Sequence, residues 1–440
     1  MLERKIKDEI EEHFRTNQVQ ALLIDGARQV GKTYIIRIVG KELFKNFIEI
    51  NMLEDSLQER LFENVRTVQD FYLQLSMISG DKLQKKSNTL IFIDEIQAYP
   101  HLLTLLKFLV DDGRFTYVAS GSQLGIALSE TSSIPMGTIK KIRMFPLDFE
   151  EFLKANGVNG LAISEMKSSF NERKSLEESV HRKIFDIFKK YLIVGGMPAS
   201  INTYLETTNI YDVRNIQNEI YEYYSIDASK YEKNKKLVIR KIYNMILSNM
   251  ENKKKRVRAK DIENKKGKTL KNYENEFEYL SSSGVATPVQ AISNPKFPLI
   301  ETGNKNLVKL YLNDVGILTA KLYGTNSHAV LADNHSINLG AVYETVVANE
   351  LRSHGHSLFY YDNRKKGEVD FMIDNYASLS VLPIEVKSGR DYTIHSALNN
   401  LTKNEDYKIN EGIVLSNSRE VKTKNSITYL PIYYSMFLGT

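Results

Sequence analysis

Apolar runs and amphipathic stretches alternate along the first 155 residues of the chain. Short runs that are apolar throughout are typical of strands buried on both faces, and alternating apolar and polar residues indicate a half-buried strand. These patterns predict strands at residues 21–25, 46–52, 89–95, 115–123 and 140–147. Several segments between them have helical periodicity, so we expect a mostly parallel, three-layer α/β sheet.

The middle of the chain is polar and largely helical. Residues 156–190 are typical of a lid or connector. Helices are then predicted at 237–250, 259–264 and 269–281, followed by a strand at 284–289. Helix, short helix, helix and strand is the order of a winged-helix module.

The last part of the chain has a third pattern. A helix is predicted at residues 337–351, and strands follow at 358–361, 367–373 and 382–387. Three prolines between residues 288 and 298 indicate a boundary before it. We therefore expect three domains, which comprise residues 1–155, 156–290 and 291–440.

Composition limits the class of protein. A chain of 440 residues is too long for one ordinary core, which agrees with several domains. It contains no cysteine, so disulfides, thiolate metal sites and cysteine nucleophiles are excluded. No apolar run approaches the ~20 residues of a membrane span, and the first residues have no signal-peptide core. We expect a cytoplasmic protein that has no membrane partner.

The net charge of +5 is unevenly distributed. Residues 230–272 carry 16 Lys or Arg against 4 Asp or Glu, which leaves the rest of the chain net negative. The densest run consists of Lys253, Lys254, Lys255, Arg256 and Arg258. Within a winged-helix module, such a run indicates contact with the phosphates of DNA. The alternative is a solvated loop.

A glycine-rich motif follows the first predicted strand. It has the P-loop spacing G-x-x-x-x-G-K-[ST] and consists of Gly26, Ala27, Arg28, Gln29, Val30, Gly31, Lys32 and Thr33. The glycines let backbone N–H groups approach phosphate oxygens, and a helix that begins near Lys32 points its positive end at them. Lys32 is expected to reach the β- and γ-phosphates, and the Thr33 hydroxyl to ligate Mg²⁺. The motif predicts ATP and Mg²⁺ as ligands.

Polar residues end two other buried strands. Asp94 and Glu95 follow the apolar run at 89–93, where Asp94 would hold Mg²⁺ and Glu95 would orient or deprotonate the attacking water. The alternative is that the two acids only cap the next helix. Ser120, Ser122 or Gln123 would sense the γ-phosphate or position water, and otherwise they form a plain turn.

Four stretches resemble a known family. They are residues 26–33, 91–97 (Ile-Phe-Ile-Asp-Glu-Ile-Gln), 145–152 (Phe-Pro-Leu-Asp-Phe-Glu-Glu-Phe) and 191–198 (Tyr-Leu-Ile-Val-Gly-Gly-Met-Pro). Together they resemble prokaryotic AAA-type (AAA_14) P-loop ATPases in which the ATPase domain is joined to a C-terminal DUF4143 domain. The resemblance covers most of the chain. It implies a P-loop NTPase sheet at residues 1–155 and a DUF4143 domain with a restriction-endonuclease-like α/β fold at residues 291–440.

The C-terminal strands carry a second constellation. Asp370 on one strand and Glu385-x-Lys387 on the next form the PD-(D/E)xK nuclease pattern. Alternation along a strand puts Glu385 and Lys387 on one face and buries Val386. Asp370 and Glu385 would then share a Mg²⁺ that Glu344 helps to hold, and Lys387 would activate water and stabilise charge at the phosphate. The alternative is a surface hairpin with an Asp–Lys or Glu–Lys ion pair.

Three histidines in this region, His354, His356 and His395, have no ligand spacing with one another. We interpret them as surface residues. Candidates for a transition-state arginine are Arg28, Arg114 and Arg143, and this residue can also come from another subunit.

The combined prediction is a P-loop ATPase whose nucleotide state controls a basic winged-helix module and a nuclease-like domain that cleaves DNA. One alternative is a nucleotide-switched DNA- or protein-binding regulator without nuclease activity, and another uses slow hydrolysis as a timer. Expected partners are ATP, DNA, and either another protein or further copies of the chain. The predicted catalytic residues are Lys32, Glu95, Asp370, Glu385 and Lys387.

Overall fold

The computed structural model describes residues 2–16, 19–80, 83, 88–122, 124, 137–227, 235–252, 254–332, 337–389 and 391–439, without the side chains of 301–306. Two residues named above, Gln123 and Lys253, lie outside the described residues. The chain divides into two compact units. The first comprises Met1–Phe145 and Ser282–Gly284, and the second comprises Pro146–Ser281 and Val285–Thr440. The predicted three-domain division stays a prediction.

The first unit is built on a five-stranded sheet in the order β2-β3-β4-β1-β5. Its strands are β1 (Ala21–Asp25), β2 (Asn46–Asn51), β3 (Thr89–Asp94), β4 (Thr116–Gly121) and β5 (Ile139–Arg143). All four strand pairs are parallel. The predicted parallel α/β sheet is therefore confirmed, and β4 separates the strand before the P-loop from the strand that ends in Asp94.

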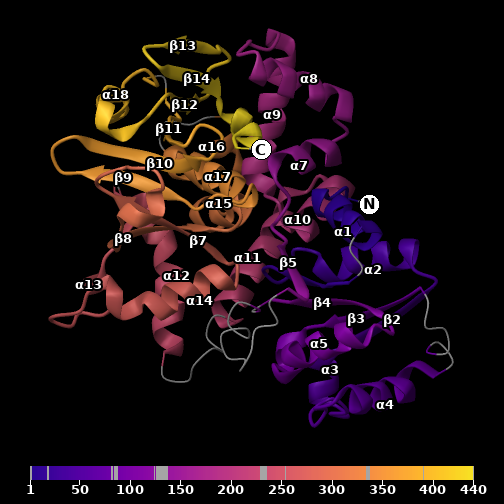
Figure 1. Ribbon diagram of the computed structural model, residues 1–440. Helices are drawn as coiled ribbons and strands as arrows, with labels where there is room; N and C mark the ends of the chain where they lie inside the picture. Colours follow the sequence, from indigo (N-terminus) through magenta and orange to yellow (C-terminus); the bar gives the residue numbers. More distant parts are fainter. Residues whose placement is uncertain are drawn as a thin grey trace. The chain divides into compact units, whose positions relative to one another are not determined.

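Helices cover both faces of this sheet, which makes three layers (Figure 1). On one face α2 (Lys32–Leu43) packs against β2, β3 and β4, and α1 (Lys5–Thr16) packs against α2. The other face is covered by α3 (Met52–Leu57), α4 (Val68–Ser79), the 3-10 turn η2 (Ile96–Ala98) and α5 (His101–Asp112). Burial on both faces explains why β1, β3 and β4 are apolar almost throughout.

β5 ends at Arg143, four residues before the end predicted from the sequence. The Met144 N–H still donates to the Asp25 carbonyl at 2.7 Å. Pro146 has no N–H with which to extend the ladder. The chain leaves the sheet at this point.

The second unit contains a mixed nine-stranded sheet in the order β13-β14-β12-β11-β10-β9-β7-β8-β6. Its strands are β6 (Arg256–Val257), β7 (Ala286–Ile292), β8 (Gly303–Leu312), β9 (Phe359–Asn363), β10 (Gly367–Asn375), β11 (Ser380–Val386), β12 (Gly412–Ser416), β13 (Lys422–Lys424) and β14 (Ile427–Pro431). The parallel pair β7–β9 joins the strands of the middle region to those of the C-terminal region. One sheet therefore runs through both regions.

Helices of the second unit surround this sheet. They are α7 (Phe149–Ala155), α8 (Gly160–Asn171), α9 (Glu178–Val194), α10 (Pro198–Thr207), α11 (Ile210–Asp227), α12 (Lys236–Glu251), α13 (Ala259–Ile262), α14 (Glu274–Ser282), α15 (Val315–Tyr323), α16 (Ser327–Leu331), α17 (Leu339–Ser353) and α18 (Ser396–Thr402). Helix α17 packs on β7, β8 and β11, and α18 packs on β10 with a separate apolar cluster. None of the described helices combines the length and the apolar character that crossing a bilayer requires.

Of the four stretches that resemble the family, the last two, residues 145–152 and 191–198, contact each other. The contact lies in the second unit, just after the chain leaves the five-stranded sheet. The Leu147 N–H donates to the Gly196 carbonyl at 2.7 Å, and the Tyr191 hydroxyl donates to the Leu147 carbonyl at 2.9 Å. A Cβ at Gly196 would lie 2.1 Å from the Leu147 carbonyl oxygen, so the close approach requires glycine. The Gly196 N–H also donates to Asp314 at 2.6 Å. This junction fixes the segment that enters α7.

Candidate functional site

The P-loop bends where its glycines allow it. Gly26 has φ 153°, Gly31 has φ 101°, and Gln29 adopts the left-handed region with φ 65°. A Cβ at Gly26 would lie 2.3 Å from the Met144 carbonyl oxygen, so this position accepts no side chain without movement. Helix α2 begins directly after Gly31, at Lys32. The loop thus turns from β1 into a helix N-terminus, as the motif predicts.

Lys32 is buried and turned onto its own loop. Its ammonium group donates to the carbonyl oxygens of Gly26 and Ala27, at 2.8 Å each. Burial lowers the pKa of Lys32, although the nearby carboxylates of Glu95, Asp25 and Asp94 oppose that shift. An anion bound in the loop would therefore relieve a desolvated positive charge.

Asp94 is the polar centre at the end of β3. Its carboxylate accepts a hydrogen bond from the Thr33 hydroxyl at 3.0 Å and another from the Ser120 hydroxyl. The backbone N–H of Glu95 donates to it at 3.1 Å. Residues from α2, β3 and the neighbouring strand β4 are thus brought to one edge of the sheet.

Glu95 adopts a left-handed backbone conformation with φ 52°. Its carboxylate accepts a hydrogen bond from the Gln97 amide, and its side chain makes no cap to the 3-10 turn that follows. The alternative prediction, that Asp94 and Glu95 only cap a helix, therefore does not describe their side-chain contacts. Left-handed non-glycine residues are often found at functional sites.

The remaining predicted residues of this unit differ in position. Ser122 is 2% exposed, and its hydroxyl has no hydrogen-bond partner among the described residues. Arg143 ends β5 at the same edge as the P-loop and donates to the Ser282 carbonyl at 3.1 Å. Arg114 precedes β4, at the opposite edge, where it pairs with Asp112 at 3.0 Å and stacks on Tyr72. The sheet therefore separates Arg114 from the P-loop.

The second predicted site lies between β10, β11 and α17. The antiparallel register that pairs Phe371 with Ile384 brings Asp370 beside Glu385. Asp370 accepts the Val386 N–H at 2.8 Å, and the Lys387 ammonium lies 2.7 Å from a Glu385 oxygen. Glu385 and Lys387 therefore share a face of the chain. The other Glu385 oxygen is buried and has no hydrogen-bond partner among the described residues.

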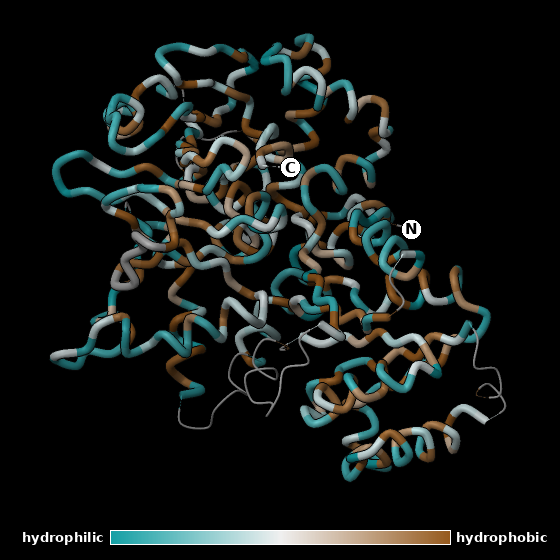
Figure 2. Tube along the Cα trace, in the orientation of Figure 1, coloured by the Kyte–Doolittle hydropathy of each residue, from teal (hydrophilic) through white to brown (hydrophobic). Residues whose placement is uncertain are grey.

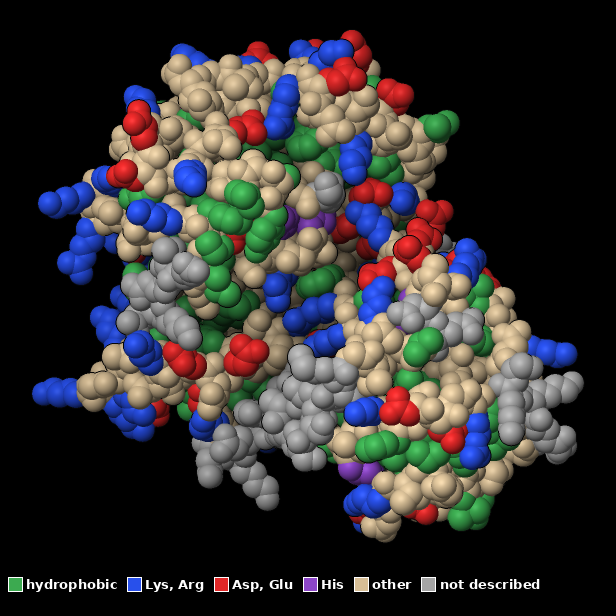
Figure 3. Space-filling view, viewed as in Figure 1, with side chains coloured by type: hydrophobic (Ala, Val, Ile, Leu, Met, Phe, Trp, Pro, Cys, Tyr) green, Lys and Arg blue, Asp and Glu red, His purple; other side chains and the backbone are tan. Residues whose placement is uncertain are grey.

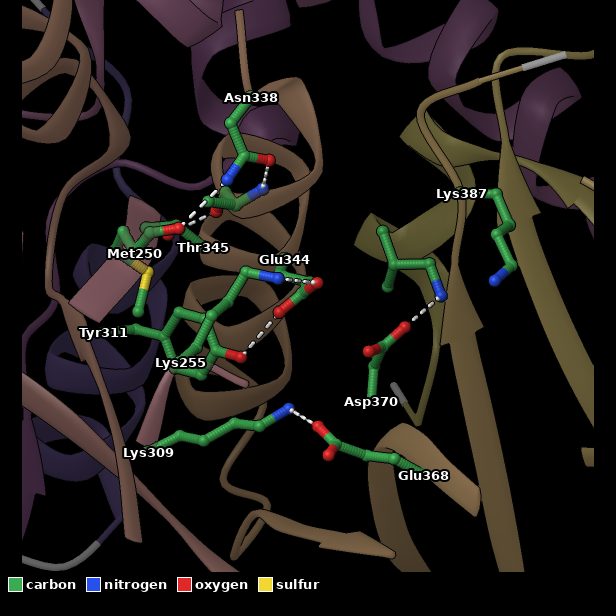
Figure 4. Close-up of polar contacts among 12 residues, drawn as sticks. Met250, Lys255, Lys309, Tyr311, Asn338, Glu344, Thr345, Glu368, Asp370 and Lys387 are labelled. Atoms are coloured by element: carbon green, nitrogen blue, oxygen red, sulfur yellow. Dashed lines mark hydrogen bonds and ion pairs between the residues drawn. The ribbon is translucent and has the colours of Figure 1, made fainter. Parts of the chain in front are cut away.

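Glu344 faces Asp370 from helix α17 (Figure 4). One of its oxygens lies 2.9 Å from the Lys255 ammonium, and the other accepts the Tyr311 hydroxyl at 2.8 Å. The Lys255 and Glu344 side chains are 13% and 6% exposed, so the ion pair is largely shielded from water. Both carboxylate oxygens of Glu344 are thus occupied by protein groups.

A further ion network borders this site. Lys309 is 1% exposed, and its ammonium lies 2.6 Å from a Glu368 oxygen and 4.6 Å from the centre of the Tyr360 ring. Arg256 pairs with the other Glu368 oxygen at 2.6 Å and with Asp362 at 2.8 Å. No signal in the local sequence marked Lys309 or Glu368, because their roles arise from strand pairing.

Burial and neighbouring charges raise the pKa of Asp370 and of Glu385. Burial raises the pKa of Asp370 well above its ordinary value, and the charges of Glu385 and Glu344 add to the shift. Burial also raises the pKa of Glu385, which Lys387 partly offsets. For Lys387, burial lowers the pKa, but Glu385 outweighs it and the net shift is upward. Like charges held together out of water are relieved by protonation or by a bound cation.

Metal-ligand geometry appears elsewhere in the described residues. Asp148, Glu350 and His354 bring one ligand atom each within 4.8 Å of one another, and Glu344, Asp370 and Glu385 do not form such a group. Glu350 also accepts the Phe149 N–H at 2.8 Å, at the start of α7. Glu350 and His354 are four residues apart at the end of α17, whereas Asp148 precedes α7 and joins them only through the fold.

The interpretation of the histidines as surface residues is wrong for His395. That residue is 6% exposed and hydrogen-bonds the Tyr429 hydroxyl at 2.7 Å. The His354 side chain is 6% exposed, and its ring hydrogen-bonds the Leu438 carbonyl at 2.9 Å. His356 is half-buried, and burial lowers its pKa. Tertiary packing covers these rings, which no local pattern indicates.

The basic run divides between the interior and the surface. Lys255 and Arg256 are half-buried in the ion pairs above, whereas Lys254 and Arg258 are exposed. More exposed lysines follow, at Lys260 in α13 and at Lys265, Lys266, Lys268 and Lys271 on the α13–α14 connection. This connection is hydrophilic in Figure 2, and Lys and Arg side chains gather over it in Figure 3. We call residues 258–271 the basic segment.

Comparison with known families agrees with this geometry. Residues 18–153 match the AAA_14 model, described as an AAA domain. Residues 185–328 and 339–434 match DUF8612 and DUF4143, both described as domains of unknown function. The chain therefore contains an AAA-type P-loop ATPase domain and a DUF4143 domain, and this part of the predicted resemblance is confirmed.

The chain is also similar to individual proteins. The uncharacterized protein MJ1544 of Methanocaldococcus jannaschii is 26% identical over 365 residues, which are 80% of this chain and 71% of the relative. The solved structure of the Walker-type ATPase PABY2304 of Pyrococcus abyssi is 13% identical, has a TM-score of 0.45, and covers 76% of this chain and 96% of its own. Cdc6p from Pyrobaculum aerophilum is 11% identical with a TM-score of 0.30, and it covers 76% of this chain and 95% of its own.

Proposed function

We propose that the protein binds ATP with Mg²⁺ at the P-loop and hydrolyses it. The observation that carries this proposal is the contact between Thr33 and Asp94, 3.0 Å from hydroxyl to carboxylate, beside the N-terminus of α2. A hydroxyl and a carboxylate together are the oxygen donors that Mg²⁺ prefers. These two residues would hold the ion, and the ion would neutralise charge on the phosphates.

The chain's own residues supply the remaining functions. The N–H groups of the loop and the Lys32 ammonium would bind the phosphates, once Lys32 leaves the carbonyls of Gly26 and Ala27. Glu95 would accept a proton from the attacking water, and Gln97 orients its carboxylate. The buried Ser122 hydroxyl would donate to the γ-phosphate.

Phosphate release from ATP tests this proposal. We expect Mg²⁺-dependent release by the purified full chain and almost none by Glu95→Gln. Release that EDTA does not affect, or that Glu95→Gln leaves unchanged, would contradict the assignment.

We further propose that nucleotide state controls a DUF4143 domain that cleaves DNA with a divalent metal. What supports it is the buried Glu385 oxygen that has no hydrogen-bond partner in the described part of the chain, beside Asp370 and Lys387. Carboxylate oxygens are the ligands that Mg²⁺ and Mn²⁺ require, and the mutual repulsion of these acids favours a cation. Asp370 and Glu385 would hold the metal, which would activate water, and Lys387 would stabilise charge on the phosphate.

The second candidate is a nucleotide-switched binder of nucleic acid that cleaves nothing. Two observations favour it: Lys255 and Lys309 neutralise acids of the C-terminal site, and the basic segment, residues 258–271, exposes six Lys or Arg. The order α12, β6, α13, α14, β7, β8 agrees with a winged helix, whose helix–turn–helix would include this segment.

Purified protein with supercoiled and linear DNA, Mn²⁺ or Mg²⁺, and ATP separates the two candidates. Cleavage that is lost in Asp370→Asn and kept in Asp374→Asn supports the nuclease, since both acids lie on β10 and Asp374 accepts the Leu299 N–H. Retention of DNA without cleavage, weakened by salt, supports the binder. Neither result would leave an ATPase without a nucleic-acid partner.

A further inference from the structure

The ammonium group of Lys255 lies in the C-terminal acidic site, whereas Lys254 and Arg258 of the same basic run are exposed. We call Glu344, Asp370 and Glu385 the acid cluster. Lys255 contacts Glu344 at 2.9 Å, with 13% of its side chain exposed. A cation therefore already occupies one corner of the cluster.

Each oxygen of Glu344 has a protein partner, and Lys255 is one of the two. The Tyr311 hydroxyl takes the second one at 2.8 Å, and Figure 4 shows Lys255 and Tyr311 both at the Glu344 carboxylate, which faces Asp370. Among the described residues, the three acids do not bring ligand atoms within 4.8 Å of one another. Three carboxylates that are to share one ion have to approach more closely than this, so the cluster has to rearrange, and Glu344 is the member that Lys255 holds.

The segment that holds Lys255 has only a short backbone pairing with the sheet, although its Arg256 side chain pairs with Glu368 and Asp362. It leads into β6, an edge strand of two residues, Arg256 and Val257, which pairs only with β8. Lys255 itself is in the left-handed region with φ 48°, a conformation that costs a non-glycine residue about 1 kcal/mol or more. Short edge strands open more readily than central ones. The position of Lys255 is therefore both costly and easily changed.

We propose that Lys255 is an intramolecular cation that occupies Glu344 in place of a divalent metal, so that metal binds the acid cluster only when Lys255 withdraws. This inference rests on the proposed metal-dependent function of the C-terminal site. A buried carboxylate requires a compensating charge. Lys255 supplies it in the structure described above, and the metal supplies it in the active state.

Mn²⁺ binding to the full chain without nucleotide tests the competition. Lys255→Met keeps the aliphatic stem and removes the charge, and Lys254→Met makes the same change at the exposed neighbour. Bound Mn²⁺ is measured by electron paramagnetic resonance, and the part that Asp370→Asn removes is assigned to the acid cluster. We expect Lys255→Met to raise the affinity of this part by about tenfold or more, since a competing unit charge at contact distance is lost. Lys254→Met should leave it unchanged.

The outcomes are distinguishable. Wild-type protein that binds Mn²⁺ through Asp370 with the affinity of Lys255→Met would overturn the competition and leave the proposed function standing. Absence of Asp370-dependent binding in every variant would overturn both. Should Lys255→Met fail to fold, amide exchange at Arg256 and Val257 in the wild type decides: Mn²⁺ should accelerate it, and exchange that Mn²⁺ leaves unchanged rejects the proposal.

Discussion

The Thr33 hydroxyl donates to the Asp94 carboxylate at 3.0 Å, across a sheet edge to which the chain returns after sixty-one residues. The contact exists because β3 and β4 run parallel to β1 and end at the same edge. Ser120 donates to the same carboxylate from the strand between them. The two oxygens that we propose as Mg²⁺ ligands are thus positioned by hydrogen bonds among α2, β3 and β4.

Lys32→Ala should weaken ATP binding by about 100-fold, because a charge-assisted contact to phosphate is lost. The first unit should stay folded, since burial lowers the pKa of Lys32 and its charge is not a source of stability. Fluorescent ATP titration gives the affinity, and circular dichroism reports the fold. The exposed Lys41→Ala on the same helix is the control. Wild-type affinity in Lys32→Ala would refute the assignment of the loop.

Glu95→Gln should bind ATP within a few-fold of wild type and hydrolyse it about 100-fold or more slowly, because the amide cannot accept a proton from water. Phosphate release under single-turnover conditions separates the chemical step from product release. Glu54→Gln, an exposed acid at the start of α3, should keep the wild-type rate. Equal losses in both variants would point to a general effect of charge.

Lys265→Gln combined with Lys268→Gln should weaken DNA binding and reduce the slope of log affinity against log salt by about 2, because two phosphate contacts are removed. Both lysines are exposed on the basic segment. Fluorescence anisotropy at several salt concentrations measures the slope. The double control Lys403→Gln with Lys408→Gln removes two exposed lysines elsewhere. An unchanged slope in the first pair would exclude the basic segment from the contact.

Asp314 should make the second unit more stable at lower pH. Burial raises its pKa to about 6, although the N–H groups of Gly196 and Ile317 favour the ionised form. The pKa of Asp314 in the folded protein exceeds its unfolded value of about 3.9, so protonation stabilises the folded state. This stabilisation is complete below about pH 4 and is lost as the pH rises through about 6. The free energy of unfolding changes by about 3 kcal/mol over this range. Asp314→Asn cannot titrate and serves as the reference.

Urea unfolding of both proteins across that pH range measures the difference in their free energies of unfolding. As the pH falls, the free energy of unfolding of the wild type should rise relative to that of Asp314→Asn. A constant difference would show that Asp314 does not change its protonation state on unfolding.

The first site could be predicted from sequence because its chemistry lies in contiguous stretches. Gly26 to Thr33 form one loop, and Asp94 and Glu95 end one apolar run. The ends of parallel strands meet at one edge, so the strand pattern alone predicts their proximity. The pairing of Glu385 with Lys387 followed from alternation in the same way.

The contacts of the second site could not be predicted, because they depend on register between distant strands. Lys255 reaches Glu344 only because β6 pairs with β8 so that Arg256 lies opposite Lys309. Nothing in the sequence of this basic run distinguishes Lys255 and Arg256, which form buried ion pairs, from Lys254 and Arg258, which are exposed. Asp148 likewise joins Glu350 and His354, which are four residues apart on α17, through helix packing that no spacing encodes.

The parallel pairing of Gln290–Ile292 with Phe359–Tyr361 limits how the two matched families can be separated or exchanged in this protein. β7 and β8 belong to the DUF8612 match and β9 to β14 to the DUF4143 match, so two sequence families divide a single sheet between them. Dividing the chain between residues 328 and 339 would leave each fragment with an unpaired edge strand, which promotes aggregation. Neither matched region is therefore an independent domain in this protein. Replacing one of them with an unrelated sequence has to restore the β7–β9 strand pair.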